Sequence, residues 1–113
     1  MKRGRIFEKD IQEYTIKITD EMIEKTQIEI KETRKNIEAI IKMNEHIQTE
    51  IDKLKEELIY QTLEEQNTIN NEIYRMEKEM ETNDKEIKKY ELDVQSYESK
   101  IERLEQRKRD LHF

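Results

Sequence analysis

Isoleucine recurs every seventh residue along the first half of the chain, with one polar interruption. The repeat runs through Ile16, Ile23, Ile30, Ile37, Asn44, Ile51 and Leu58. A seven-residue apolar repeat lies along one side of a helix, and repetition over this length imposes a left-handed supercoil on paired helices. The chain is therefore predicted to be all-α and to form a coiled coil.

A second repeat with the same period covers the other half, but it is displaced by one residue. It runs through Ile73, Met80, Ile87, Val94 and Ile101, and eight residues rather than seven separate Leu58 from the next core position, Gln66. Such a slip marks either a turn between two helices or local unwinding of one long helix.

The predicted seam joins both repeats to the apolar residues between their members. Tyr90 and Tyr97 are taken as bulky seam residues rather than as ligand-stacking ones. The seam that a partner helix would cover is Ile16, Ile23, Ile30, Ile37, Ile40, Ile47, Ile51, Leu54, Leu58, Ile69, Ile73, Met76, Met80, Ile87, Tyr90, Val94, Tyr97, Ile101, Leu104 and Leu111. Ile41 and Met43 widen this stripe, which points to a third or fourth helix docking there.

Composition favours a rod over a globular domain. Charged residues make up 44% of the chain and hydrophobic residues 33%, with no Pro and one Gly. So polar a chain cannot fill a globular interior, yet nothing interrupts a helix from Ile6 onward.

Acidic residues flank the second repeat and constrain the partner. They are Glu72, Glu77, Glu79, Asp84, Glu86, Glu91, Asp93, Glu98 and Glu105. In a parallel homodimer these carboxylates would face one another, at a cost on the order of 2–3 kcal/mol before salt screening. A parallel homodimer is therefore disfavoured, and the partner is either a different helical chain or the chain's own first half.

The preferred prediction is a long antiparallel helical hairpin. If the chain turns back within residues 62–65, Leu58 faces Ile69 and Asn44 faces Asn83. An Asn–Asn layer would satisfy both amides and fix the register. The same register brings Arg34 toward Glu91 and Asp20 toward Glu105.

The alternative is one long helix in a heteromeric coiled coil. The connection between the two helices of a hairpin usually contains Gly, Asn, Asp or Pro, and none of these occurs from Tyr60 to Gln66. The predicted organisation is a basic tail (1–7), a first arm (8–61), a turn or skip (62–68) and a second arm (69–111).

Basic residues gather near both ends of the sequence. They are Lys2, Arg3, Arg5, Arg103, Arg107, Lys108 and Arg109. Together they could contact phosphate or an acidic protein surface. Equally, cations in a last helical turn complement the helix macrodipole, so direct nucleic-acid binding is left open.

No residue set points to catalysis, to a cofactor or to a metal. The chain has no Cys, and His46 and His112 lie in different halves. The carboxylates lie on solvated faces between lysines and arginines. We expect a protein that is not an enzyme. No apolar stretch is long enough to span a membrane and no secretory leader follows Met1, so an intracellular chain without membrane contact is expected.

One stretch resembles a known family. The run from Tyr97 to His112 carries an acidic heptad passage that leads into Leu104, Glu105 and the basic run Arg107-Lys108-Arg109. In this it resembles the basic coiled-coil end of the seventh subunit of the THO complex. The resemblance implies a non-catalytic subunit of a nuclear assembly that couples transcription to messenger RNA export, paired there with another coiled-coil subunit.

Two functions follow as expectations. The first is a structural subunit or tether whose seam recruits a different helical chain. The second is a free-standing acidic hairpin that acts as an adaptor or inhibitor of a basic or nucleic-acid-binding protein.

Overall fold

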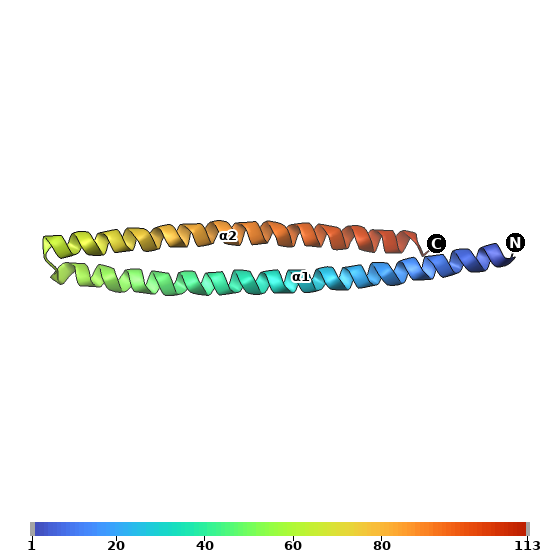
Figure 1. The fold of residues 1–113 in the computed structure, drawn as a ribbon, viewed down its shortest axis with the longest axis horizontal. Coiled ribbons are helices and arrows are strands. Elements are labelled where there is room, and N and C mark those ends of the chain that lie inside the picture. The colour runs from blue at the N-terminus through green and yellow to red at the C-terminus, as the bar shows by residue number, and fades with distance from the viewer. Residues whose placement is uncertain (1, 113) are drawn as a thin grey trace. The chain divides into compact units, whose positions relative to one another are not determined.

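The computed structural model describes residues 2–112 of the chain and the side chains of residues 8–112. Helix α1 spans Lys2–Glu57, a 3₁₀ turn (η1) spans Leu58–Tyr60, and helix α2 spans Leu63–Asp110 (Figure 1). The described residues contain no strand. This confirms an all-α helical hairpin, and the chain is not the single continuous helix of the alternative.

The chain divides into two units, each built from a part of both helices. Unit 1 comprises the described residues of Met1–Arg34 and Leu92–Phe113, and unit 2 is Lys35–Glu91, which contains the turn. Isoleucine is the main buried apolar residue in both units, and Val94 joins it in unit 1. Ile23, Ile30 and Val94 are buried in unit 1, and Ile40, Ile51 and Ile73 are buried in unit 2.

Burial follows the seven-residue period within each unit. Every predicted seam residue is buried or half-buried, whereas most of the residues between them are exposed. Most seam residues are only half-buried, because one neighbouring helix covers a narrow stripe of each helix. Much of the apolar surface therefore stays within reach of solvent.

Threonine fills the seam of unit 1 where the apolar repeat is weak. Thr19 and Thr26 are buried, with Thr26 only 1% exposed. Their hydroxyls donate to backbone carbonyls one turn earlier in α1, to Thr15 O at 2.7 Å and Met22 O at 2.8 Å. Because the hydroxyls are satisfied inside their own helix, the threonine methyl groups can occupy the seam without leaving a buried polar group unpaired.

The turn lies earlier than the predicted 62–68 segment, most of which belongs to α2. The side chain of Gln66 ties the turn together, since its Nε2 donates to Leu58 O at 3.0 Å and to Gln61 O at 3.2 Å. No described residue has a positive φ. The turn therefore needs no Gly or Asn, because a glutamine side chain satisfies carbonyls that a left-handed residue would otherwise serve.

A reciprocal capping box starts α2. Thr62 Oγ1 accepts from the Glu65 backbone N–H at 3.3 Å, and Glu65 Oε2 accepts from the Thr62 N–H at 3.3 Å. Threonine followed three residues later by glutamate is the sequence signature of this cap. The signature was present in the sequence, and it locates the start of α2 better than a search for glycine does.

We predict that Thr62→Ala lowers the free energy of unfolding by about 1 kcal/mol, because it removes the acceptor for the Glu65 N–H. Urea unfolding followed by circular dichroism measures the change. Thr68→Ala is the matched control. Thr68 lies inside α2 and its hydroxyl donates to Glu64 O, so alanine, a stronger helix former, should cost nothing there. Equal losses in both variants would contradict the role of the cap.

Candidate functional site

A polar layer interrupts the apolar seam of unit 2. Asn83 Nδ2 donates to Asn44 Oδ1 at 2.9 Å, and Asn44 Nδ2 donates to Asp84 Oδ1 at 3.0 Å. The structure thus brings together the two asparagines that the register prediction paired. It adds Asp84, which sequence reasoning had placed only in an acidic flank. Both asparagines are half-buried and Asp84 is exposed, so the layer runs from the seam to the surface.

An open groove of about 310 Å³ lies beside this polar layer. Its lining residues are Ile41, Asn44, Glu45, Gln48, Met80, Asp84 and Ile87. Ile41 is exposed although it is aliphatic. Met43, the other residue expected to widen the stripe, is also exposed but does not line the groove. The groove offers aliphatic groups beside polar ones.

Two ion pairs join the helices of unit 1. Arg34 Nη2 lies 2.9 Å from Glu98 Oε1, and Lys108 Nζ lies 2.6 Å from Asp20 Oδ1. Both differ from the expected neighbours, which were Glu91 for Arg34 and Glu105 for Asp20. The ends of long charged side chains move by several ångströms with rotamer, so helix register fixes their backbone level but not their partner.

The predicted basic contact residues divide into three groups. The side chains of Lys2, Arg3 and Arg5 lie outside the described residues. Lys108 is half-buried at a seam position and is engaged by Asp20. The third group consists of the exposed residues Arg103, Arg107 and Arg109.

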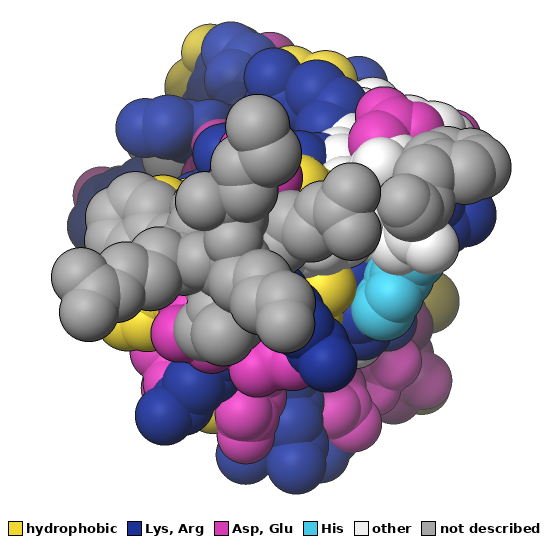
Figure 2. Space-filling model, turned by 90° about the vertical axis from the view of Figure 1, so that its right-hand side faces the viewer, with side chains coloured by type: hydrophobic (Ala, Val, Ile, Leu, Met, Phe, Trp, Pro, Cys, Tyr) yellow, Lys and Arg dark blue, Asp and Glu magenta, His cyan; other side chains and the backbone are white. Residues whose placement is uncertain are grey.

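Cations and carboxylates are mixed at this end of unit 1. Figure 2 shows Lys and Arg side chains bordered by Asp and Glu side chains rather than gathered into one basic face. Arg107, Lys108 and Arg109 occupy the last turn of α2, where positive charge complements the helix macrodipole. The helix macrodipole therefore explains why these three residues are basic, and no nucleic-acid ligand is needed to explain them.

A second apolar stripe lies on α1 outside the seam, and we call it the outer stripe. It consists of Ile11, Tyr14, Ile18 and Met22, all exposed. Their spacing of three and four residues places them on one face of the helix. This face differs from that of the seam residues Ile16 and Ile23. The sequence carried this signal, but the seven-residue repeat masked it.

Part of the outer stripe lies beyond the described part of α2. In unit 1, α1 continues past the end of α2 (Figure 1). Lys108 pairs with Asp20, and α2 ends at Asp110. At 1.5 Å per residue, Tyr14 lies about 9 Å beyond Asp20 along α1. Ile11 and Tyr14 therefore belong to helical turns that the described part of α2 does not reach.

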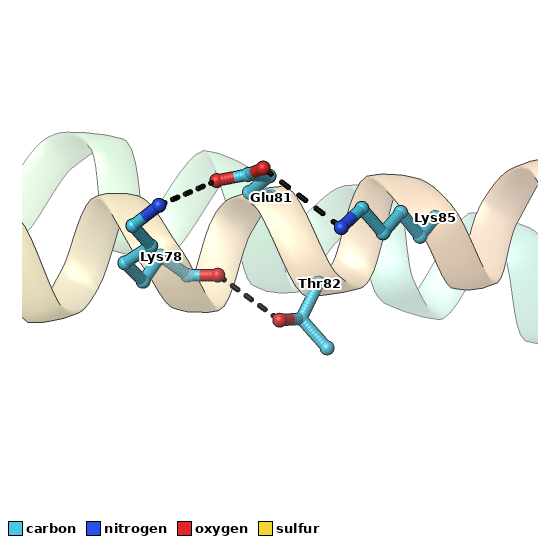
Figure 3. Close-up of polar contacts among 4 residues, drawn as sticks. All are labelled: Lys78, Glu81, Thr82 and Lys85. Carbon is cyan, nitrogen blue, oxygen red and sulfur yellow. Dashed lines mark hydrogen bonds and ion pairs between the residues drawn. The ribbon is translucent and has the colours of Figure 1, made fainter.

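A charged cluster on α2 illustrates the solvated faces of the helices. Glu81 accepts from Lys78 at 3.4 Å and lies 3.9 Å from Lys85 Nζ, while the Thr82 hydroxyl donates to Lys78 O (Figure 3). Lys78 Nζ also lies 5.5 Å from the centre of the Tyr74 ring. The hydrogen bond to Glu81 raises the pKa of Lys78, and the nearby charge of Glu81 acts in the same direction. A lysine held cationic in this way supports the helix and is not a base.

Neither a metal site nor a membrane-crossing helix emerges from the residues that the structure describes. No group of three or more His, Asp and Glu side chains among them is arranged to hold a metal ion. None of the described helical segments combines the length and the apolar character needed to cross a bilayer.

Comparison of the chain with protein-family models, with curated proteins and with solved structures finds no match.

We predict that Asn44→Ile and Asn83→Ile have coupled effects. Each single change leaves the other amide half-buried without its partner, at about 1–3 kcal/mol, whereas the double variant replaces the layer by an apolar contact. The free energy of unfolding in urea should reveal a coupling of about 1 kcal/mol or more. Asn36→Ile with Asn71→Ile, two exposed positions of unit 2, should be additive. Additivity at Asn44 and Asn83 would show that the layer does not fix the pairing.

We predict that Glu81→Gln lowers the pKa of Lys78 relative to the parent chain, because the neutral amide stabilises the ammonium less than the carboxylate does. A raised pKa in the folded state means that this pair stabilises the fold at neutral pH, and that the contribution is lost as the pH rises through the pKa of Lys78. NMR titration of the lysine side chains measures it, with Glu79→Gln as the control. An unchanged Lys78 pKa in Glu81→Gln would reject the assigned cause.

Proposed function

We propose that this chain is a non-catalytic interaction protein, an antiparallel coiled-coil hairpin that acts as an adaptor or tether for another helical protein. The outer stripe is the observation that carries the proposal. A helical face with Ile11, Tyr14, Ile18 and Met22 in contact with water is unfavourable for an isolated chain. A helical partner that presents its own apolar face would cover it.

The two helices of the chain cover each other's seam. This favours an adaptor that folds by itself over a subunit that folds only together with its partner. The seam residues of both helices are already buried or half-buried within the chain. The Asn44–Asn83 pair and the Lys108–Asp20 pair join the two helices without any other protein. A partner would therefore bind a formed hairpin on the outside rather than complete its seam.

The first turns of the outer stripe support a partner at the same place. Ile11 is 49% exposed and Tyr14 65%. These two are the most exposed members of the outer stripe, so a partner that covers them would bury the most apolar surface.

The expected affinity is modest. Full burial of one large apolar side chain contributes about 1.5–3 kcal/mol, so four residues that are already partly covered would contribute about 4 kcal/mol in total. Association itself costs at least about 4 kcal/mol. The partner therefore needs further contacts, and basic side chains that meet the acidic surface of the chain, whose net charge is −6, would supply them.

A second candidate is a structural subunit of a heteromeric assembly of the THO type, in the nucleus. The resemblance of Tyr97–His112 to the seventh THO subunit stays a prediction. It is favoured by one observation, the exposure of Arg103, Arg107 and Arg109 in the same stretch. Both candidates assume an intracellular protein, and they differ in whether the chain folds without its partner.

We predict that the purified chain is a helical monomer by light scattering and circular dichroism. Affinity purification from cells that express it should recover a helical protein. Tyr14→Ser with Ile18→Ser should reduce that recovery at least ten-fold, because it removes the centre of the outer stripe. Ile28→Ser with Leu92→Ser, two exposed apolar positions of unit 1, is the matched control.

Two results would decide against the adaptor. A chain that becomes helical only together with a partner would favour the subunit role. If the outer-stripe variant and the control variant recover the same amount of partner, the outer stripe is not part of the interface.

A further inference from the structure

Three large apolar side chains project from the turn of unit 2. Ile59 is 78% exposed, Tyr60 86% and Leu63 76%. These are the highest exposures among the large apolar residues of the described chain. A connecting turn is normally built from Gly, Asn, Asp, Ser or Pro, which serve its geometry at no cost in exposed apolar surface. We call these three residues the tip cluster.

The turn holds the tip cluster in a fixed shape. Gln66 bonds to the carbonyls of Leu58 and Gln61, and the capping box joins Thr62 to Glu65. These hydrogen bonds bracket the tip cluster on both sides in the sequence. Since the backbone is already ordered, a partner would gain from burying the side chains without the cost of ordering the loop.

Carboxylates flank the tip cluster in the sequence. Glu56 and Glu57 end α1, Glu64 and Glu65 begin α2, and Lys55 is the basic residue in the last turn of α1. Glu64 and Glu65 complement the helix macrodipole at the start of α2, whereas Glu56 and Glu57 oppose it at the end of α1. The stability of the hairpin therefore does not explain why Glu56 and Glu57 are acidic, whereas a role in recognition does.

We propose that the tip cluster is a preformed docking knob for an apolar pocket with a lysine- and arginine-rich rim on another protein. Ile59, Tyr60 and Leu63 would fill the pocket, and Glu56, Glu57 and Glu64 would meet the rim. Apolar side chains in a desolvated centre ringed by charge pairs give both affinity and specificity. An anionic membrane does not fit, because the same carboxylates would be repelled by its surface charge. This surface lies in unit 2 and is separate from the outer stripe of unit 1.

The chain contains no Trp, so Tyr60→Trp introduces a single fluorescent reporter into the tip cluster. The probe is a helical peptide of leucine and lysine, which presents an apolar face rimmed by cations. Its counterpart of leucine and glutamate carries the opposite rim. We expect the leucine–lysine peptide to shift the emission to shorter wavelength and to saturate, and the leucine–glutamate peptide to leave it unchanged.

Controls separate the knob from general attraction between opposite charges. Tyr74→Trp places the reporter on an exposed aromatic position of α2, where the same peptide should produce no shift. In the Tyr60→Trp background, Ile59→Ser with Leu63→Ser should weaken binding at least ten-fold while circular dichroism stays unchanged. Glu56→Gln, Glu57→Gln and Glu64→Gln together should weaken it and reduce its dependence on salt.

Four outcomes would overturn the proposal. If the Tyr74→Trp reporter shifts as much as the Tyr60→Trp reporter, the binding is non-specific. If the leucine–glutamate peptide binds as well as the leucine–lysine peptide, the partner needs no basic rim. A shift with phosphatidylcholine or phosphatidylserine vesicles alone would identify the tip cluster as a membrane contact. A shift that appears with rising protein concentration and no probe would identify the partner as a second copy of this chain.

Discussion

Burial of one narrow stripe on each helix is the constraint on which the rest of the structure depends. With 33% hydrophobic and 44% charged residues, each helix has one long stripe of seven-residue period, and within each unit the other helix covers it. Where apolar residues run short, Thr19 and Thr26 stand in, with hydroxyls bonded inside α1. The seam works because its polar groups are satisfied locally or in pairs, as in the Asn44–Asn83 layer.

Apolar residues outside this seam are the part of the molecule that folding leaves unexplained. Scattered exposed apolar residues are normal on any protein. The outer stripe differs because its four members share one helical face, and the tip cluster differs because it occupies a turn where small polar residues serve better. Each is held on ordered backbone, the first on a helix and the second on a hydrogen-bonded turn. Both are therefore preorganised for binding.

The sequence predicted the hairpin and the pairing of Asn44 with Asn83, because a seven-residue period fixes which face is buried and a hairpin leaves few registers. It placed the turn too late. The reason is that Gln66 and the Thr62–Glu65 cap do what glycine or asparagine does in other turns. Arg34 pairs with Glu98 rather than with the expected Glu91, and Asp20 pairs with Lys108, whereas only its like-charged neighbour Glu105 was expected. Flexible charged ends are not set by register. The outer stripe was missed, although the spacing of its four residues is visible in the sequence, because the stronger seven-residue repeat on the same helix drew the interpretation.

Incomplete burial links the stability of the hairpin to its binding. Ion pairs as exposed as Arg34–Glu98 contribute at most about 1 kcal/mol, so the helices of unit 1 are joined mainly by a seam that contains threonine. A ligand that binds only the folded form stabilises it by RT ln(1 + [L]/Kd), which reaches about 2.7 kcal/mol at a hundred-fold excess over Kd. A partner on the outer stripe would act on the unit with the weaker apolar seam. Stabilisation of unit 1 is thus an expected consequence of binding there, because the outer stripe belongs to that unit.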